Sequence, residues 1–382
     1  MMKLTGIVIS AGRSDYDRYY PILRSLNNSK KFDIYVYLTK DHFSKKYGYT
    51  HKHVSNQFKI LHAENSKFSN FKLSEFTDDL LVLVKYVNKI NPQVIFVMGD
   101  RYEMLLGPLV AIPLNIPIVH FYGGAVTEGS SDELVRHAIT KMSHLHFVAA
   151  NEYRERLLQL GEESWRVKKI GVVNLQKIKK FKFLNKKEIS VANKFNFHLP
   201  YAVLTYHPTT HELEKISKTM NFIKKAIELN KLNLIITYPN SDLKNKIVIN
   251  FIKKNFKNKK KYKIIKNCAF SNFLNIVKNS EFMIGNSSAG IVEAATIKIP
   301  TINIGSRQNG KLMPKNVINV DNKFKEISEA IKKASSGSFR KIVEKLKKSP
   351  YEDNFKSEQV IKIISKMLKR KDLLKKKFIN IK

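Results

Sequence analysis

The sequence predicts an α/β protein with parallel sheets, built from two Rossmann-like domains that face each other across a cleft. Apolar runs of strand length, rich in β-branched residues, alternate with amphipathic stretches of helix length, which is the order typical of parallel α/β folds. The chain of 382 residues is too long for one ordinary core. Its two halves also share one layout, so we expect two similar domains.

The predicted strands follow one another along the chain in two groups. Each is a short apolar run that ends in a glycine or a polar turn, and the runs cover residues 5–10, 32–38, 93–99, 116–122, 144–150, 201–206, 232–238, 281–285 and 300–305. Residues 93–124 read strand, Gly and polar turn, helix, Asn-Ile-Pro, strand and glycine pair. Residues 281–305 repeat that order with Lys-Ile-Pro.

The domain boundary is expected near residues 170–185, where lysine becomes denser and the apolar pattern weakens. The prediction is an N-terminal domain of residues 1–176 and a C-terminal domain of residues 177–382. One or two helices after about residue 340 are expected to pack back on the first domain. The basic tail at 367–378 suits a frayed helix better than contact with anionic lipid.

Composition limits the classes of partner. The net charge of +37 lies mostly in the second half, and solvated lysines on helix faces explain it better than an anionic partner does. The single Cys268 excludes an intramolecular disulfide, and neither a secretory signal nor a spanning helix is visible. We therefore expect a cytoplasmic protein with no membrane insertion. No nucleic-acid signature is present.

The stretch "EFMIGNSSAGIVEAATIKIPTINIG" predicts a strand that ends at Gly285 and a helix that begins near Ser287. Such a helix start attracts phosphate through its backbone N–H groups. Ser287 and Ser288 add hydroxyl donors, and Gly290 would permit close approach of a ligand. Glu293 lies further along the helix, within reach of ribose hydroxyls. The alternative is an ordinary serine N-cap.

Two turns in the first half carry charged residues directly after strands. "VISAGRSDYD" places Arg13, a forked cation suited to phosphate, after the first strand. Its glycine spacing fits neither a P-loop nor a dinucleotide fingerprint, so no cofactor is predicted. "VMGDRYE" places Asp100 after a strand and a glycine, where an exposed catalytic carboxylate is expected; a helix N-cap is the competing interpretation.

A dense polar run, "HFYGGAVTEGSSDELVRHAITK", follows the strand at 116–122. So many titratable groups at one strand end favour a functional site. Its members are His120, Tyr122, Glu128, Asp132, Glu133, Arg136 and His137. Asp132 and Arg136, four residues apart, would equally form a surface pair.

Three turns of the second half complete the candidates. His207 follows a strand and precedes a proline, and Asn240 and Asp242 follow another strand, where they would bind a uracil or a sugar hydroxyl or form an Asx turn. Arg307 comes after the strand at 300–305 and is expected near the turn that contains Ser287 and Ser288, the serine turn. No zinc spacing, nucleophile elbow or kinase motif occurs, so no metal is predicted.

The motifs in this order resemble the hydrolysing UDP-N-acetylglucosamine 2-epimerases, the type that opens bacterial sialic acid synthesis. The resemblance runs from "AGRSDY" to "GSRQNG" and is carried by "GDRYEM", "VTEG", "SDELVRHAITKMSHLHF", "LLQLGE", "PNSD", "IGNSSAGIVE" and "INIGSRQNG". It implies anti elimination of UDP across C1 and C2 of the sugar, followed by addition of water to give free N-acetylmannosamine. It also implies a GT-B-type pair of domains, with the sugar on the side of residues 1–176 and UDP bound by residues 177–382, and a homodimer or homotetramer.

The resemblance assigns roles to the candidate residues. Arg13, Ser287, Ser288 and Arg307 would hold the diphosphate, and Asp100 would oppose the positive charge that develops on the ring carbon. Asp132 and His207 would move the protons, in an order that the sequence leaves open. Arg101 would orient the sugar side, Asn240 and Asp242 would line the nucleotide side, and Glu293 would hold the ribose.

Two departures from the family pattern point to an altered substrate. The family commonly has Glu or His before the glycine pair and Glu after it, where this chain has Tyr122 and Ala125. Tyrosine is a poor base at neutral pH because its reference pKa is about 10. A modified sugar, such as the diacetamido-trideoxyhexose of the legionaminic acid branch, is therefore expected. A GT-B glycosyltransferase, a non-hydrolysing epimerase and a non-catalytic binding protein remain as alternatives.

Overall fold

The computed structural model describes residues 3–44, 48–62, 73–128, 132–195, 200–209, 215–240, 244–258 and 260–380. The chain forms two compact units. Unit 1 contains residues 1–125, 131–176 and 351–382, and unit 2 contains residues 126–130 and 177–350. The C-terminal residues from 351 onward thus belong to unit 1. That the two units are the domains assigned above stays a prediction.

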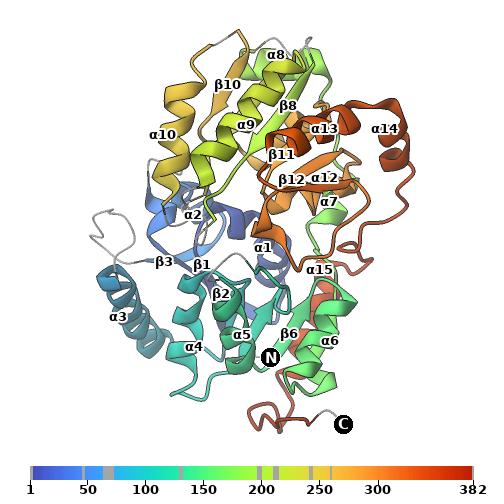
Figure 1. Cartoon of the computed structure of the whole chain (residues 1–382). Coiled ribbons are helices and arrows are strands. Elements are labelled where there is room, and N and C mark those ends of the chain that lie inside the picture. The colour runs from blue at the N-terminus through green and yellow to red at the C-terminus, as the bar shows by residue number, and fades with distance from the viewer. Residues whose placement is uncertain are drawn as a thin grey trace. The chain divides into compact units, whose positions relative to one another are not determined.

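Unit 1 is built around a seven-stranded sheet in which every neighbouring pair is parallel (Figure 1). The strands lie in the order β3-β2-β1-β4-β5-β6-β7. Their bounds are β1 Leu4–Ser10, β2 Phe32–Leu38, β3 Lys59–His62, β4 Val94–Met98, β5 Ile118–Phe121, β6 Leu145–Val148 and β7 Val167–Lys169. The order reverses between β1 and β4, which is where parallel α/β sheets place their ligands.

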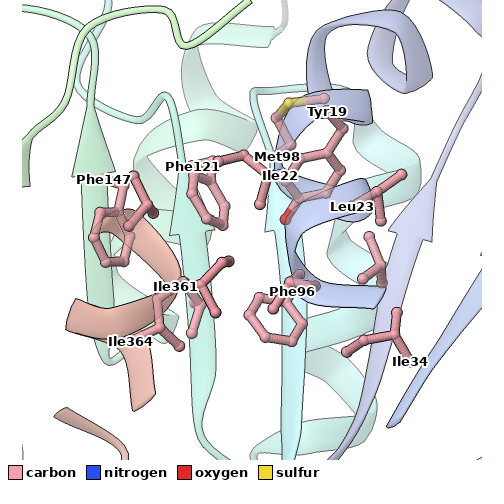
Figure 2. Close-up of a cluster of buried hydrophobic side chains, with 14 of the residues drawn as sticks. Tyr19, Ile22, Leu23, Ile34, Phe96, Met98, Phe121, Phe147, Ile361 and Ile364 are labelled. Carbon is pink, nitrogen blue, oxygen red and sulfur yellow. The ribbon is translucent and has the colours of Figure 1, made fainter. Parts of the chain in front are cut away.

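Helices cover both faces of this sheet. They are α1 Arg13–Asn27, α2 His51–Ser55, α3 Leu73–Ile90, α4 Leu106–Ala111, α5 Asp132–Met142, α6 Asn151–Gln159 and α15 Ser357–Met367, while α7 Leu175–Lys179 spans the junction between the units. Figure 2 shows one apolar layer, in which Ile22 of α1 and Ile361 of α15 approach phenylalanines of the central strands. The helix α15 is therefore part of the unit 1 core.

Unit 2 repeats the arrangement with a six-stranded parallel sheet in the order β10-β9-β8-β11-β12-β13. Its strands are β8 Tyr201–Thr205, β9 Asn233–Thr237, β10 Tyr262–Ile265, β11 Met283–Gly285, β12 Thr301–Ile304 and β13 Val317–Val320. Its helices are α8 Lys186–Asn193, α9 Ile216–Leu229, α10 Asn245–Asn255, α11 Phe270–Lys278, α12 Glu293–Thr296, α13 Phe324–Ser335 and α14 Gly337–Glu344. The strand order reverses between β8 and β11.

All nine predicted strands are present, and the two segments predicted to share a layout occupy equivalent places. Residues 93–124 form β4, α4 and β5 of one sheet, and residues 281–305 form β11, α12 and β12 of the other. The four strands that the sequence did not predict, β3, β7, β10 and β13, lie at the sheet edges. Edge strands are short and carry polar residues, which weakens their apolar signal.

Candidate active site

Asp100 lies at the reversal point of the unit 1 sheet, directly after β4. Gly99 has φ of 76°, a left-handed conformation that glycine adopts without strain. The turn leaves the Asp100 side chain 31% exposed at the carboxyl end of the strand. This is the position expected for an exposed catalytic carboxylate.

Arg136 of α5 holds the Asp100 carboxylate in place. Its side chain is fully buried, and Nε donates to Asp100 Oδ2 at 3.1 Å while Nη2 forms an ion pair with the same oxygen. Nη1 donates to Glu133 Oε2 at 2.5 Å and to the carbonyl oxygen of Ala125 at 2.8 Å. Burial alone would lower the pKa of Arg136, but the charges of Asp100 and Glu133 raise it. The interpretation of Arg136 and Asp132 as a surface pair is therefore wrong, because Arg136 is buried and pairs with Asp100.

Two carboxylates share one guanidinium in this cluster, which leaves a net negative charge beside the exposed face of Asp100. Glu133 Oε1 is also 2.9 Å from His137 Nε2. A site of this charge suits the stabilisation of a cationic ring carbon. Asp132, the first residue of α5, is partly buried and begins the same helix.

Arg101 forms a second charged cluster with three carboxylates. Its guanidinium binds Glu103 through Nε at 3.1 Å and Nη2 at 2.7 Å, and Nη2 also donates to Asp41 at 3.2 Å. Asp15 Oδ2 lies 4.0 Å from Arg101 Nε. The sequence predicted that Arg101 orients the sugar side of the substrate. The structure shows that the guanidinium of Arg101 binds Glu103 and Asp41, both within unit 1.

Asp15 was not among the residues predicted from the sequence, although it stands in the stretch "VISAGRSDYD". It lies in the first turn of α1, two residues after Arg13. Its Oδ2 is buried and has no hydrogen-bond partner among the described residues. Burial raises the pKa of Asp15 to about 7, against the opposing charge of Arg101. The side chain therefore carries an exchangeable proton near neutral pH, at the reversal point of the sheet.

The hydroxyl of Tyr122 is held by a hydrogen bond within unit 1. The residue has φ of 63°, an uncommon conformation for a side chain of this size. The hydroxyl accepts a hydrogen bond from Val173 N at 3.3 Å. Burial raises the pKa of Tyr122 to about 12, so at neutral pH it is even less available as a deprotonated base than tyrosine in water. Its role in substrate binding stays a prediction.

In unit 2, Asn286 joins the turns that follow three strands. Its side chain is buried, accepts from His207 N at 2.7 Å and donates to His207 O at 2.9 Å. Its carbonyl oxygen accepts from Arg307 Nη1 at 3.0 Å and from Gln308 Nε2 at 2.8 Å. Asn286 was not predicted from the sequence, where its only signal was its place in "IGNSSAGIVE". Arg307 lies beside the serine turn, as expected.

The serine turn differs in detail from the prediction. Ser287 Oγ accepts from Ala289 N at 3.3 Å, which is an N-cap. The expected helix is a 3₁₀ turn at Ser288–Gly290 followed by the four-residue helix α12. The expected role of Gly290 in approach to a ligand is not supported, because a Cβ there would lie 2.4 Å from Cγ2 of Thr301. The glycine allows the turn to pack on β12.

The remaining predicted residues are distributed along the same turns. His207 is buried, and its Nδ1 accepts from Asn240 N at 3.4 Å; a neutral ring then carries its proton on Nε2. Glu293, at the start of α12, is only 4% exposed. Asp242 lies outside the described residues. Within the described ranges, no group of three or more His, Cys, Asp or Glu is suited to a metal ion, and none of the helices is long and apolar enough to cross a membrane.

The two sheets, each with the Rossmann strand order and with charged turns at its point of reversal, define an α/β protein of the class that binds nucleotides at strand ends. The family model described as UDP-N-acetylglucosamine 2-epimerase matches residues 24–365. The chain therefore belongs to the UDP-N-acetylglucosamine 2-epimerase family and is an enzyme of that class.

Two relatives match over most of their length. The chain is 36% identical over 354 residues to the GDP/UDP-N,N'-diacetylbacillosamine 2-epimerase (hydrolyzing) of Campylobacter jejuni, with 89% of this chain and 90% of the relative covered. It is 32% identical over 333 residues to the UDP-N,N'-diacetylbacillosamine 2-epimerase (hydrolyzing) of Legionella pneumophila, with 86% and 88% covered. The solved UDP-N-acetylglucosamine 2-epimerase of Neisseria meningitidis has a TM-score of 0.81 at 17% identity, covering 95% of this chain and all of that one; it shares the fold.

Proposed function

We propose that this chain is a hydrolysing 2-epimerase of a UDP-linked diacetamido sugar, UDP-N,N'-diacetylbacillosamine, and that it serves nonulosonic acid biosynthesis in the cytoplasm. The two relatives at 36% and 32% identity carry that substrate in their names. The UDP-N-acetylglucosamine 2-epimerase of Neisseria meningitidis is less similar, at 29% identity over 335 residues. The departures at Tyr122 and Ala125 support the same choice.

The observation that carries the reaction is the Asp100–Arg136 pair at the end of β4. In the first half-reaction the C1–O bond breaks and its electron pair leaves with UDP, while a base removes the C2 proton. The partly exposed Asp100 would stabilise positive charge at C1, and Arg136 would keep its carboxylate in a fixed orientation. Arg101 would position the sugar side.

The leaving diphosphate would be held by Arg13 together with the serine turn and Arg307 of unit 2. The contact of Arg307 with the carbonyl oxygen of Asn286 keeps that guanidinium beside Ser287. Asn240, Asp242 and Glu293 would bind the nucleoside. In the second half-reaction water adds across the C1–C2 double bond, with hydroxide to C1 and a proton to the opposite face of C2. Asp132 and His207 would be the proton-transfer pair.

The reaction is tested by an NMR time course in D2O with UDP-N,N'-diacetylbacillosamine and, separately, with UDP-N-acetylglucosamine. The proposal expects UDP and a free 2-epimerised sugar with deuterium at C2, formed faster from the diacetamido substrate. The Asp100→Asn variant is the control and should release no UDP.

Each alternative gives a different result. Release of free N-acetylmannosamine from UDP-N-acetylglucosamine as the faster reaction would keep the chemistry and change the substrate. UDP-N-acetylmannosamine without UDP release would indicate a non-hydrolysing epimerase. UDP release that depends on an added acceptor sugar would indicate a glycosyltransferase. If both UDP-sugars stay intact, the result would indicate a non-catalytic binding protein.

A further inference from the structure

The chain continues beyond α15 as a tail, residues 368–380, that is ordered against unit 1 rather than a frayed helix. The fully buried guanidinium of Arg166 donates to the carbonyl oxygens of Leu373 at 2.7 Å and Lys375 at 3.1 Å. Near the end of the tail, Ile379 N donates to the carbonyl oxygen of Gly161 at 3.0 Å. The tail is therefore fixed at both ends.

Between these two anchors, Lys376 caps the C-terminus of α5. Its Nζ donates to the carbonyl oxygens of Thr140 at 3.1 Å, Lys141 at 2.8 Å and Ser143 at 2.6 Å. Carbonyl groups at the end of a helix lack partners within the helix and carry its negative dipole end, so a cation is favoured there. Nζ also lies 2.8 Å from Oε2 of Glu162, a carboxylate with no exposed surface.

A buried hydrogen-bond path leads from this cap to the turn that holds Asp100. Thr140 Oγ1 is 3.4 Å from His120 Nδ1, and His120 Nε2 is 2.9 Å from the carbonyl oxygen of Gly99. Burial lowers the pKa of His120 to about 3, so the ring is neutral. A carbonyl oxygen only accepts, so Nε2 carries the proton and Nδ1 accepts from the Thr140 hydroxyl.

The helix α5 supplies a second connection. Its C-terminal carbonyls bind Lys376, and its buried Arg136 binds the Asp100 carboxylate. One element therefore joins the tail to Asp100, and the path through His120 fixes the backbone just before it. Both connections lie within unit 1.

We propose that Lys376 is a positioning residue, which holds α5 and the Gly99–Asp100 turn in the geometry that the reaction needs. The expected effect of Lys376 on turnover rests on the proposed function. Its expected effect on local stability is independent of that function, because loss of the cap should let α5 and the Asp100 turn open more often whichever substrate the enzyme takes.

The test compares Lys376→Met with Lys377→Met, in the full-length protein. Methionine keeps the length of the side chain and removes its charge, and Lys377 is an exposed neighbour that serves as the matched control. For Lys376→Met we expect amide hydrogen exchange in residues 97–106 and 132–142 to become about 10-fold faster. We also expect kcat to fall about 10-fold or more with little change in KM. UDP affinity should remain as in the wild type, because most of the groups proposed to hold UDP lie in unit 2 and Arg13 is not part of the Lys376 contacts.

Exchange and kcat at wild-type levels in Lys376→Met would overturn the inference. A uniform rise in exchange over both units, with weaker UDP binding, would also overturn it, because that result indicates a general loss of stability. If Lys376→Met does not fold, Thr140→Val tests the path instead. This variant keeps the helix cap and removes only the Thr140 hydroxyl that binds His120. Unchanged amide exchange at residues 97–106 would then refute the path. A wild-type enzyme without turnover would refute the proposed function, while the exchange comparison would still test the positioning.

Discussion

Replacement of Arg136 by methionine removes one guanidinium from three acceptors at once. The side chain is fully buried and binds Asp100, Glu133 and the carbonyl oxygen of Ala125. Methionine fills much of the same volume but removes the guanidinium that both carboxylates share. The carboxylates lose charge compensation in a site that water reaches only in part.

The size of the effect follows from the burial of the three groups. Breaking a buried ion pair by removing one partner costs about 3–5 kcal/mol. Because the Asp100 and Glu133 side chains are 31% and 26% exposed, water compensates part of that loss, and we expect the free energy of unfolding to fall by about 2–3 kcal/mol. A displacement of Asp100 by 1 Å would lower kcat by about 100-fold.

Urea denaturation and a UDP-release assay measure the two effects separately. Arg136→Lys keeps the charge but lacks the fork that matches three acceptors, so its kcat should lie between those of the wild type and Arg136→Met. Arg154→Met is the control, because Arg154 pairs with its neighbour Glu155 at the surface. An Arg136→Met enzyme with wild-type stability and kcat would refute the reasoning that Arg136 holds Asp100.

Three further predictions concern other parts of the chain. The Ser287→Ala, Ser288→Ala double variant should weaken UDP binding by about 1–3 kcal/mol in calorimetry, and unchanged affinity would mean that the backbone alone binds the diphosphate. Gly285→Ala should lower the free energy of unfolding by more than about 2 kcal/mol, because φ is 134° and a Cβ would lie 2.1 Å from the carbonyl oxygen of Thr205. Gly337→Ala is the control and should unfold with nearly the wild-type free energy, because nothing lies within 4 Å of a Cβ there. Burial lowers the pKa of His42 to about 3, so the unfolded chain takes up this proton as the pH falls below about 6.5 and the folded chain does not. Between about pH 7 and about pH 5 the wild type should therefore lose about 2 kcal/mol more stability than His42→Gln, and equal losses in urea denaturation would contradict the buried neutral histidine.

The sequence was sufficient to predict the central strands and the repeated layout of the two sheets. These features depend on local apolar periodicity, which short segments carry by themselves. It was also sufficient for the family, because the turn motifs occur in order along most of the chain. The edge strands escaped prediction because polar and lysine-rich segments such as β7 and β10 become strands only when a neighbouring strand is available to pair with them.

The tertiary structure alone decided which charged side chains meet. Arg136 is four residues from Asp132 but binds Asp100, 36 residues away, because the strand order brings the ends of β4 and β5 together. Asn286 reaches His207 across 79 residues, and Lys376 caps α5 from 236 residues beyond Thr140. Periodicity describes which face of an element is buried, whereas an ion pair needs two elements at a defined distance. That distance is set by sheet register and packing. The sequence could therefore nominate candidate site residues, which stay predictions, but it could not show which of their side chains meet.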